Sequence, residues 1–207
     1  MDAPTIRRAI AVAFGALVLL ADASLSATPP MQPHGARTRL IRIDAHTIPV
    51  TLRELVGPPA GVEATCIIPQ TLAHVWGVLS DYDHLEKVVP FVTESRVLRR
   101  DGDTIMLYQE GRGGLSLFQR RFSVTFRVHE TPMREIRFEA FKGDFTQFTG
   151  FWRLEPHADG TLVHHQVSIE PAFYLPRWVM RLVMRHMLLH GVEAVIQRCL
   201  RGSLENG

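Results

Sequence analysis

The sequence predicts an α+β fold in which a curved antiparallel sheet wraps around one long C-terminal helix. Between Val92 and Phe173, short segments of alternating apolar and polar residues follow one another with almost no helical pattern. A long apolar helical pattern then closes the sequence. Strands with one solvent-exposed face must bury the other face, and the C-terminal helix is the element available to pack against it. We therefore look for function on the concave face between the two.

The strands are assigned from a period of two. Residues 121–129 alternate apolar and polar side chains, which is typical of a half-buried strand. Turn-forming residues separate further segments of similar pattern. These segments are 105–111, 136–141, 145–154 and 162–170. Because the connections are short, neighbouring strands should be antiparallel and form a meander.

Two short helices are predicted after the first core strand, residues 62–68. Residues 71–80 place four apolar side chains on one face, and residues 84–89 form a second helix that a proline ends. The final helix covers about residues 176–200 and spans roughly 35 to 40 Å at 1.5 Å per residue. This length is enough to cross the sheet.

Residues 1–27 are predicted to be an export signal. Two arginines precede thirteen uncharged residues, 9–21, and small residues then offer cleavage after Ala23 or Ala27. As a helix this run is about 20 Å long, too short for a hydrocarbon core of about 30 Å. A cleaved signal is therefore favoured over the alternative of an N-terminal membrane anchor, and we expect the mature protein in the periplasm.

The rest of the chain is predicted to be a leader followed by one domain. Residues 28–60 begin with a proline-rich stretch and include strand-like segments, so we expect a leader with one extra edge strand. The domain covers residues 61–207. A formal net charge of +2 argues against nucleic acid as a partner. Phosphate-loop and dinucleotide fingerprints are absent from the sequence, and no cofactor is predicted.

Four segments carry recognisable motifs: residues 80–98 (SDYDHLEKVVPFVTESRVL), 143–145 (GDF), 150–156 (GFWRLEP) and 170–173 (EPAF). Together they resemble the Bet v 1-like or START-like (SRPBCC) superfamily, and within it the polyketide cyclase/dehydrase and coenzyme Q-binding (lipid transport) branch. The resemblance covers about residues 62–200. It implies the helix-grip fold and a cavity between sheet and C-terminal helix for a hydrophobic ligand. In this superfamily most members bind or carry lipids, and some cyclise polyketides.

A set of apolar side chains is predicted to line this cavity, although the same side chains could pack together and fill it. The members on the sheet are Phe122, Phe126, Phe138, Phe148, Trp152, Val167 and Ile169. Phe91 follows the second short helix and is expected at the cavity mouth, as the related folds imply. Trp178 and Leu182 of the final helix complete the set.

His165 is the polar residue that separates binding from chemistry. It alternates in phase with Val163 and Val167, so its ring is expected to point inward. There it is either a hydrogen-bonded core residue or a group that orients a ligand carbonyl or acts as acid or base. We prefer a carrier of a lipid, quinone or polyketide-like compound. The alternatives are an aromatase or cyclase that uses His165, and a protein-interaction module.

Two further groups of residues have competing interpretations. His186, His190 and Glu193 share one side of the final helix and could bind zinc, but such spacing more often marks a polar helix face. Cys66 and Cys199 could form a disulfide after export, but two separately buried thiols are favoured.

The final helix carries a second apolar side, formed by Met180, Met184 and Met187 beside Arg177 and Arg181. Three interpretations remain open for it: cover by residues of the leader, contact with a membrane surface or a partner protein, and simple exposure. In membrane contact, the arginines would approach anionic head groups while the methionines enter the boundary layer.

Overall fold

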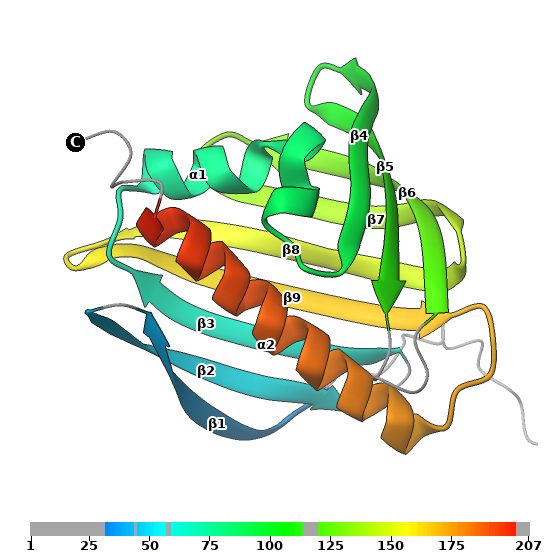
Figure 1. The fold of residues 1–207 in the computed structure, drawn as a ribbon, viewed down its shortest axis with the longest axis horizontal. Helices are drawn as coiled ribbons and strands as arrows, with labels where there is room; N and C mark the ends of the chain where they lie inside the picture. Colours follow the sequence, from blue (N-terminus) through cyan, green and yellow to red (C-terminus); the bar gives the residue numbers. More distant parts are fainter. Residues whose placement is uncertain (1–31, 44, 57–58, 114–119, 202–207) are drawn as a thin grey trace, which may run out of the picture. The chain divides into compact units, whose positions relative to one another are not determined.

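The computed structural model describes residues 32–43, 45–56, 59–113 and 120–201, so the predicted export signal lies outside the described residues. The described chain forms one nine-stranded sheet with the order β1-β2-β3-β9-β8-β7-β6-β5-β4 (Figure 1). The strands are β1 (Gln32–Ile43), β2 (His46–Val56), β3 (Ala60–Ile68), β4 (Val92–Asp101), β5 (Thr104–Gly113), β6 (Arg120–Thr131), β7 (Glu135–Gly143), β8 (Phe145–His157) and β9 (Gly160–Pro171). The helices are α1 (Leu72–Ser80), the 3₁₀ helix η1 (Tyr82–Lys87) and α2 (Arg177–Arg201).

This architecture confirms the predicted α+β helix-grip fold. Strands β4 to β9 are consecutive antiparallel neighbours, as the short connections required. The chain leaves β3 through α1 and η1, reaches the opposite edge at β4, and returns strand by strand until β9 pairs with β3. Figure 1 shows α2 running obliquely in front of β3 and β9. Among the described helices, none combines the length and apolar character needed to span a bilayer.

The segment before the domain contains two strands instead of the single predicted edge strand. Strands β1 and β2 form a hairpin that pairs with β3 and extends the sheet. Its apolar residues Ile41, Ile43, Ile48 and Val50 are buried in the main core. Strand β1 is only partly apolar because it is an edge strand with an irregular register between His34 and Arg37. Residues 40–44 and 50–55 have strand-like composition in the sequence, but the Gly- and Pro-rich break at residues 57–61 led us to expect a single edge strand.

The two short helices close one end of the core. The Thr71 hydroxyl caps α1 by accepting a hydrogen bond from the His74 backbone N–H at 3.3 Å. The His74 ring in turn donates through Nε2 to the Cys199 carbonyl at 2.9 Å, near the end of α2. The predicted second helix is present as the tighter η1, which begins two residues earlier than expected.

Both cysteines are buried in the core, where α2 packs against β3. Cys66 on β3 and Cys199 on α2 are buried free thiols, so the separate thiols favoured from the sequence are what the structure contains. Burial raises the pKa of each thiol to about 12, which keeps both protonated and unreactive at neutral pH.

Candidate functional site

Two adjoining apolar cavities lie between the concave face of the sheet and α2. The inner cavity has a volume of about 190 Å³ and is lined by α1, η1, strands β4 to β9 and α2. The outer cavity, of about 720 Å³, extends toward the start of α2. Phe91, Phe148, Met184 and Met187 are among the residues that line both. The two cavities therefore adjoin along these shared side chains.

Nine of the eleven residues predicted to contact a ligand lie in the walls of these cavities; the contact itself stays a prediction. They are Phe91, Phe122, Phe126, Phe138, Phe148, Trp152, His165, Val167 and Ile169. Trp178 and Leu182 were placed wrongly: they are 66% and 48% exposed and line neither cavity. Helical periodicity correctly grouped them as one stripe, but it does not tell which side of a helix a neighbour covers.

The methionines occupy the position that Trp178 and Leu182 were expected to fill. Met180 and Met184 are 9% and 2% exposed, and Met187 is half-buried. All three line the outer cavity. The prediction of an exposed methionine face is therefore wrong, and the protein-interaction alternative loses the surface on which it depended. Residues of the predicted leader do lie beside this face, because Glu54 and Ala60 line a further space together with Met180 and Met184. Flexible thioether side chains suit a wall that must adapt to a ligand.

Aromatic rings form a continuous row from the outer to the inner cavity. Phe122 meets Phe145 edge to face with 5.5 Å between ring centroids, and Phe145 meets Phe148 at 5.0 Å. Phe148 then contacts Phe126 at 4.9 Å and Phe138 at 6.1 Å. These edge-to-face contacts are favourable in themselves. The rings support one another along the wall and leave the adjoining space open.

Gly150 on β8 leaves room for the Phe138 ring. The two residues are paired across β7 and β8. A Cβ atom at Gly150 would collide with the Phe138 ring and with the Gln166 carbonyl. The absent side chain therefore provides the space into which the ring tilts, and a larger residue would push Phe138 into the inner cavity.

His165 forms part of the inner wall and is held in one orientation. Its Nδ1–H donates to the Phe151 carbonyl at 2.9 Å, because a carbonyl oxygen only accepts. Its ring stacks on the Trp152 indole, with 3.6 Å between centroids and 8° between planes. Burial lowers the pKa of His165 to about 4, despite the opposing effect of this hydrogen bond. The ring is therefore neutral at physiological pH.

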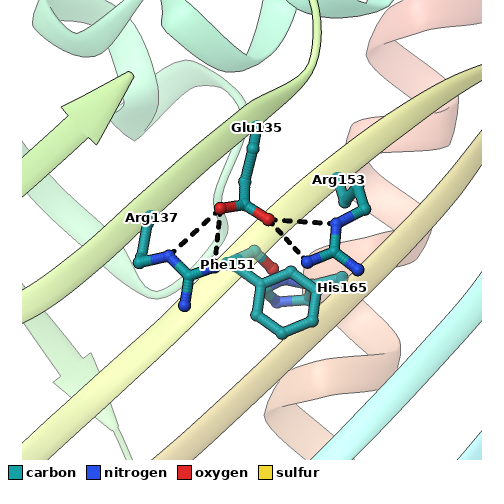
Figure 2. Close-up of polar contacts among 5 residues, drawn as sticks. All are labelled: Glu135, Arg137, Phe151, Arg153 and His165. Atoms are coloured by element: carbon teal, nitrogen blue, oxygen red, sulfur yellow. Dashed lines mark hydrogen bonds and ion pairs between the residues drawn. The ribbon is translucent and has the colours of Figure 1, made fainter. Parts of the chain in front are cut away.

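An ion-pair cluster on the outer face of the sheet holds the strand that supplies this carbonyl. The Glu135 carboxylate accepts hydrogen bonds from Arg137 at 2.6 Å and from Arg153 at 2.7 Å, and Figure 2 shows it between the two guanidinium groups. Both guanidinium groups also lie over the Phe151 ring. Burial alone would raise the pKa of Glu135, but the two arginines lower it below its ordinary value. This cluster links β7 to β8 directly behind His165.

Two other polar residues of the inner wall were not selected from the sequence. The Tyr82 hydroxyl donates to Glu130 at 2.7 Å, and the Gln109 amide donates to the Ser95 hydroxyl at 3.3 Å. Gln109 is two residues from the buried Leu107 in β5, a phase that could have revealed it. Irregular register between β4 and β5 made that phase uncertain.

The histidine pair of α2 lies against Phe91. The His186 and His190 rings are 4.1 Å apart, and the Phe91 ring lies 6.3 and 6.5 Å from them. His190 donates through Nδ1 to the His186 carbonyl. In the described part of the chain, no three His, Cys, Asp or Glu side chains are arranged to hold a metal ion. The pair therefore packs against Phe91, a residue in the walls of both cavities.

Comparison with known families agrees with this geometry. The model of the polyketide cyclase/dehydrase and lipid transport family matches residues 68–196. The chain belongs to this family. The resemblance inferred from the motifs is thus confirmed. The match spans α1 to the C-terminal half of α2 and so contains most residues of the cavity walls.

Solved structures show the same fold at low sequence identity. The Zhui aromatase/cyclase from Streptomyces sp. R1128 superposes with a TM-score of 0.60 at 16% identity, covering 68% of this chain and 93% of that one. The STAR-related lipid transfer protein from Xanthomonas axonopodis gives 0.58 at 19%, covering 78% and 98%. Human STARD10 gives 0.59 at 12%, covering 81% and 74%. No curated protein matches the sequence.

Proposed function

We propose that this protein binds and carries an apolar small molecule, such as a lipid, quinone or polyketide-like compound. The observation that carries the proposal is the pair of adjoining apolar cavities, whose shared aromatic wall runs from the outer cavity to His165. The volume of the outer cavity, about 720 Å³, falls in the range of cavities that enclose small organic ligands. The family and the lipid transfer proteins of the same fold support the same conclusion.

Binding is favoured over catalysis by the state of His165. A general base works best when its pKa is near the operating pH. Burial lowers the pKa of His165 to about 4, so the neutral ring is a weak base and holds no proton at Nε2 to give as an acid. The family and the shared fold with Zhui still support the aromatase or cyclase alternative. His165, the residue proposed for that chemistry, is not suited to acid or base catalysis.

We further propose that the carrier meets a membrane through an exposed surface at the start of α2, here called the α2 outer patch. It consists of Tyr174, Arg177, Trp178, Arg181, Leu182 and Arg185. Tyr174 and Trp178 are 90% and 66% exposed. Aromatic rings and arginines together suit the interface between head groups and acyl chains. Phe173 and Val179, which line the outer cavity, come from the same stretch of chain, so ligand transfer over a short distance is possible there.

Export to the periplasm completes the proposal and rests on the N-terminal sequence alone. Thirteen uncharged residues and the small residues after them support a cleaved signal. N-terminal sequencing of protein recovered from the periplasm tests it, with a new terminus after Ala23 or Ala27 as the expected result. Recovery of the intact chain in the membrane fraction would favour an anchor.

The binding proposal is tested with an uncharged fluorescent probe, N-phenyl-1-naphthylamine, and two matched variants. Phe148→Asp places a carboxylate in the wall shared by both cavities, whereas Phe141→Asp makes the same change at a 60% exposed position that lines neither cavity. An unpaired charge in an apolar site costs several kcal/mol. We expect at least a tenfold loss of probe affinity in folded Phe148→Asp and none in Phe141→Asp. Equal binding by both variants would contradict the proposal.

A further inference from the structure

We infer that the ligand presents a hydrogen-bond donor, in particular a ring hydroxyl, to Nε2 of His165 in the inner cavity. This inference rests on the proposed binding function and specifies the chemical class of the ligand. The sequence left open that His165 orients a ligand carbonyl. The geometry of its ring assigns the opposite role.

The tautomer of His165 is fixed by its backbone partner. The Phe151 carbonyl lies 2.9 Å from Nδ1 and can only accept, so Nδ1 carries the proton. In a neutral imidazole the other nitrogen is then an acceptor. The stack on Trp152 and the hydrogen bond together oppose a ring flip that would exchange the two nitrogens. Nε2 therefore offers a lone pair.

This lone pair has access to the inner cavity. The His165 ring lines the inner cavity and is 9% exposed. If Nε2 were fully enclosed, it would be a buried polar atom without a hydrogen-bond partner. Among the described side chains, only Oε2 of Glu86 is such an atom, so Nε2 is not fully enclosed by the protein. No side chain in the described residues donates to Nε2. A buried acceptor is costly when unpaired, which favours a ligand that supplies a donor.

The size of the inner cavity selects the kind of group that carries the donor. Its volume is about 190 Å³, and an apolar cavity of about 150 Å³ admits a benzene-sized ring. Phe126, Phe138 and Trp152 supply aromatic walls for such a ring. The larger outer cavity then accommodates an apolar tail. The fitting ligand has a hydroxylated ring at one end and a hydrophobic chain at the other.

The assignment discriminates between ligand classes that the apolar walls alone accept equally. A quinone carbonyl would face the Nε2 lone pair, whereas the hydroxyl of the corresponding quinol donates to it. A carboxylate is disfavoured as well, because none of the described residues that line the inner cavity is a Lys or Arg. We therefore expect phenol-like or quinol-like compounds to bind more tightly than their carbonyl counterparts.

The test compares 4-octylphenol with 4-octyltoluene, which differ by one hydroxyl in place of one methyl. Affinities are measured for the wild type and for His165→Phe, which keeps an aromatic ring against Trp152 but removes the acceptor. We expect the relative affinity for the phenol to fall roughly three- to tenfold in His165→Phe, the usual contribution of one neutral hydrogen bond. Transfer from water is common to both proteins and cancels in this comparison.

His164→Phe is the matched control, because His164 is the adjacent residue, lines neither cavity and bonds Thr65 instead. It should leave the preference unchanged. In a measurement that needs no variant, the ¹⁵N resonance of His165 Nε2 should move when the phenol is added and stay in place with the toluene. An equal preference in wild type and His165→Phe, with Nε2 unmoved, would overturn the inference while leaving the binding function standing. Binding of neither compound would overturn both.

Discussion

The two ends of α2 differ although they carry the same apolar stripe. Trp178 and Ile196 are eighteen residues, or about five turns, apart and so occupy the same side of the helix. Ile196 is fully buried, whereas Trp178 is 66% exposed. At the C-terminal end the stripe joins a core that contains residues of β1, β2 and β3. At the N-terminal end the buried side is the adjacent one, where Met180 and Met184 line the outer cavity.

The apolar stripe is thus packed in the core at its C-terminal end and faces solvent at its N-terminal end. An adjacent side of α2 lines the cavities along much of the helix, because Leu188, Gly191 and Val195 line the inner cavity. At the N-terminal end, α2 contributes one flexible wall to a cavity and leaves a basic aromatic surface uncovered. Core packing and surface exposure are thus assigned to opposite ends of one apolar stripe, and this division can be tested.

The largest expected effect comes from a pair of substitutions at equivalent positions on the two ends. Ile196→Ala should lower the free energy of unfolding by about 2 to 5 kcal/mol, because it leaves a void in a packed core. Trp178→Ala should change it by less than about 0.5 kcal/mol, because the ring is mostly exposed. Urea denaturation measures both. A large loss in Trp178→Ala would mean that its side chain is covered in solution.

The second effect concerns pH and the cavity wall. The pKa of His165 is about 4 in the folded protein and near 6.5 when unfolded, so the unfolded chain binds an extra proton between these values. The contribution to stability is complete above pH 6.5 and is lost as pH falls toward 4. From the difference between the two pKa values, this contribution to the free energy of unfolding amounts to roughly 3 kcal/mol. His165→Phe should lack this part of the acid sensitivity, as measured by urea denaturation at several pH values. The same pH dependence in both proteins would place the titrating group elsewhere.

The smallest expected effect is on membrane binding by the α2 outer patch. Wild type should co-sediment weakly with anionic vesicles, less so at high salt, because each arginine near the surface contributes about 1 kcal/mol. Arg177→Glu combined with Arg181→Glu should reduce binding at least tenfold, and Trp178→Ser with Leu182→Ser should also weaken it.

Arg99→Glu combined with Arg134→Glu is the control for this measurement. It changes the net charge equally at exposed positions away from α2. Equal sedimentation of the control and the patch variant would mean that only overall charge matters. Absence of wild-type binding at low salt would remove the membrane role and leave the cavity unaffected.

Most of the fold was predictable because it depends on local patterns. Alternation and short turns identified β5 to β9, and a long apolar pattern identified α2. Residues 40–44 and 50–55 also have strand-like composition, but their pairing as a hairpin was not predicted, because a Gly- and Pro-rich break at residues 57–61 separates them from β3. The cavity walls on the sheet were predictable for the same reason, since the strand period assigns Phe126 and His165 to the concave face.

Which side of α2 lines the cavities was not predictable, because it depends on which distant segments of the chain pack against the helix. One apolar stripe is buried at Ile196 and exposed at Trp178, and the residues of the stripe do not themselves reveal this difference. The tautomer of His165 was equally hidden, since it depends on a backbone carbonyl from the neighbouring strand. Such features follow from register and packing, and sequence periodicity carries no information about them.

Native mass spectrometry of protein purified gently from its natural host tests the central claim most directly. If the cavity carries an apolar ligand, wild type and Phe141→Asp should retain one small apolar compound per chain, and Phe148→Asp should show the bare mass. Where the natural compound is lost during purification, added N-phenyl-1-naphthylamine should restore the same difference. A wild type that retains neither compound, or that retains them no better than Phe148→Asp, would contradict the account.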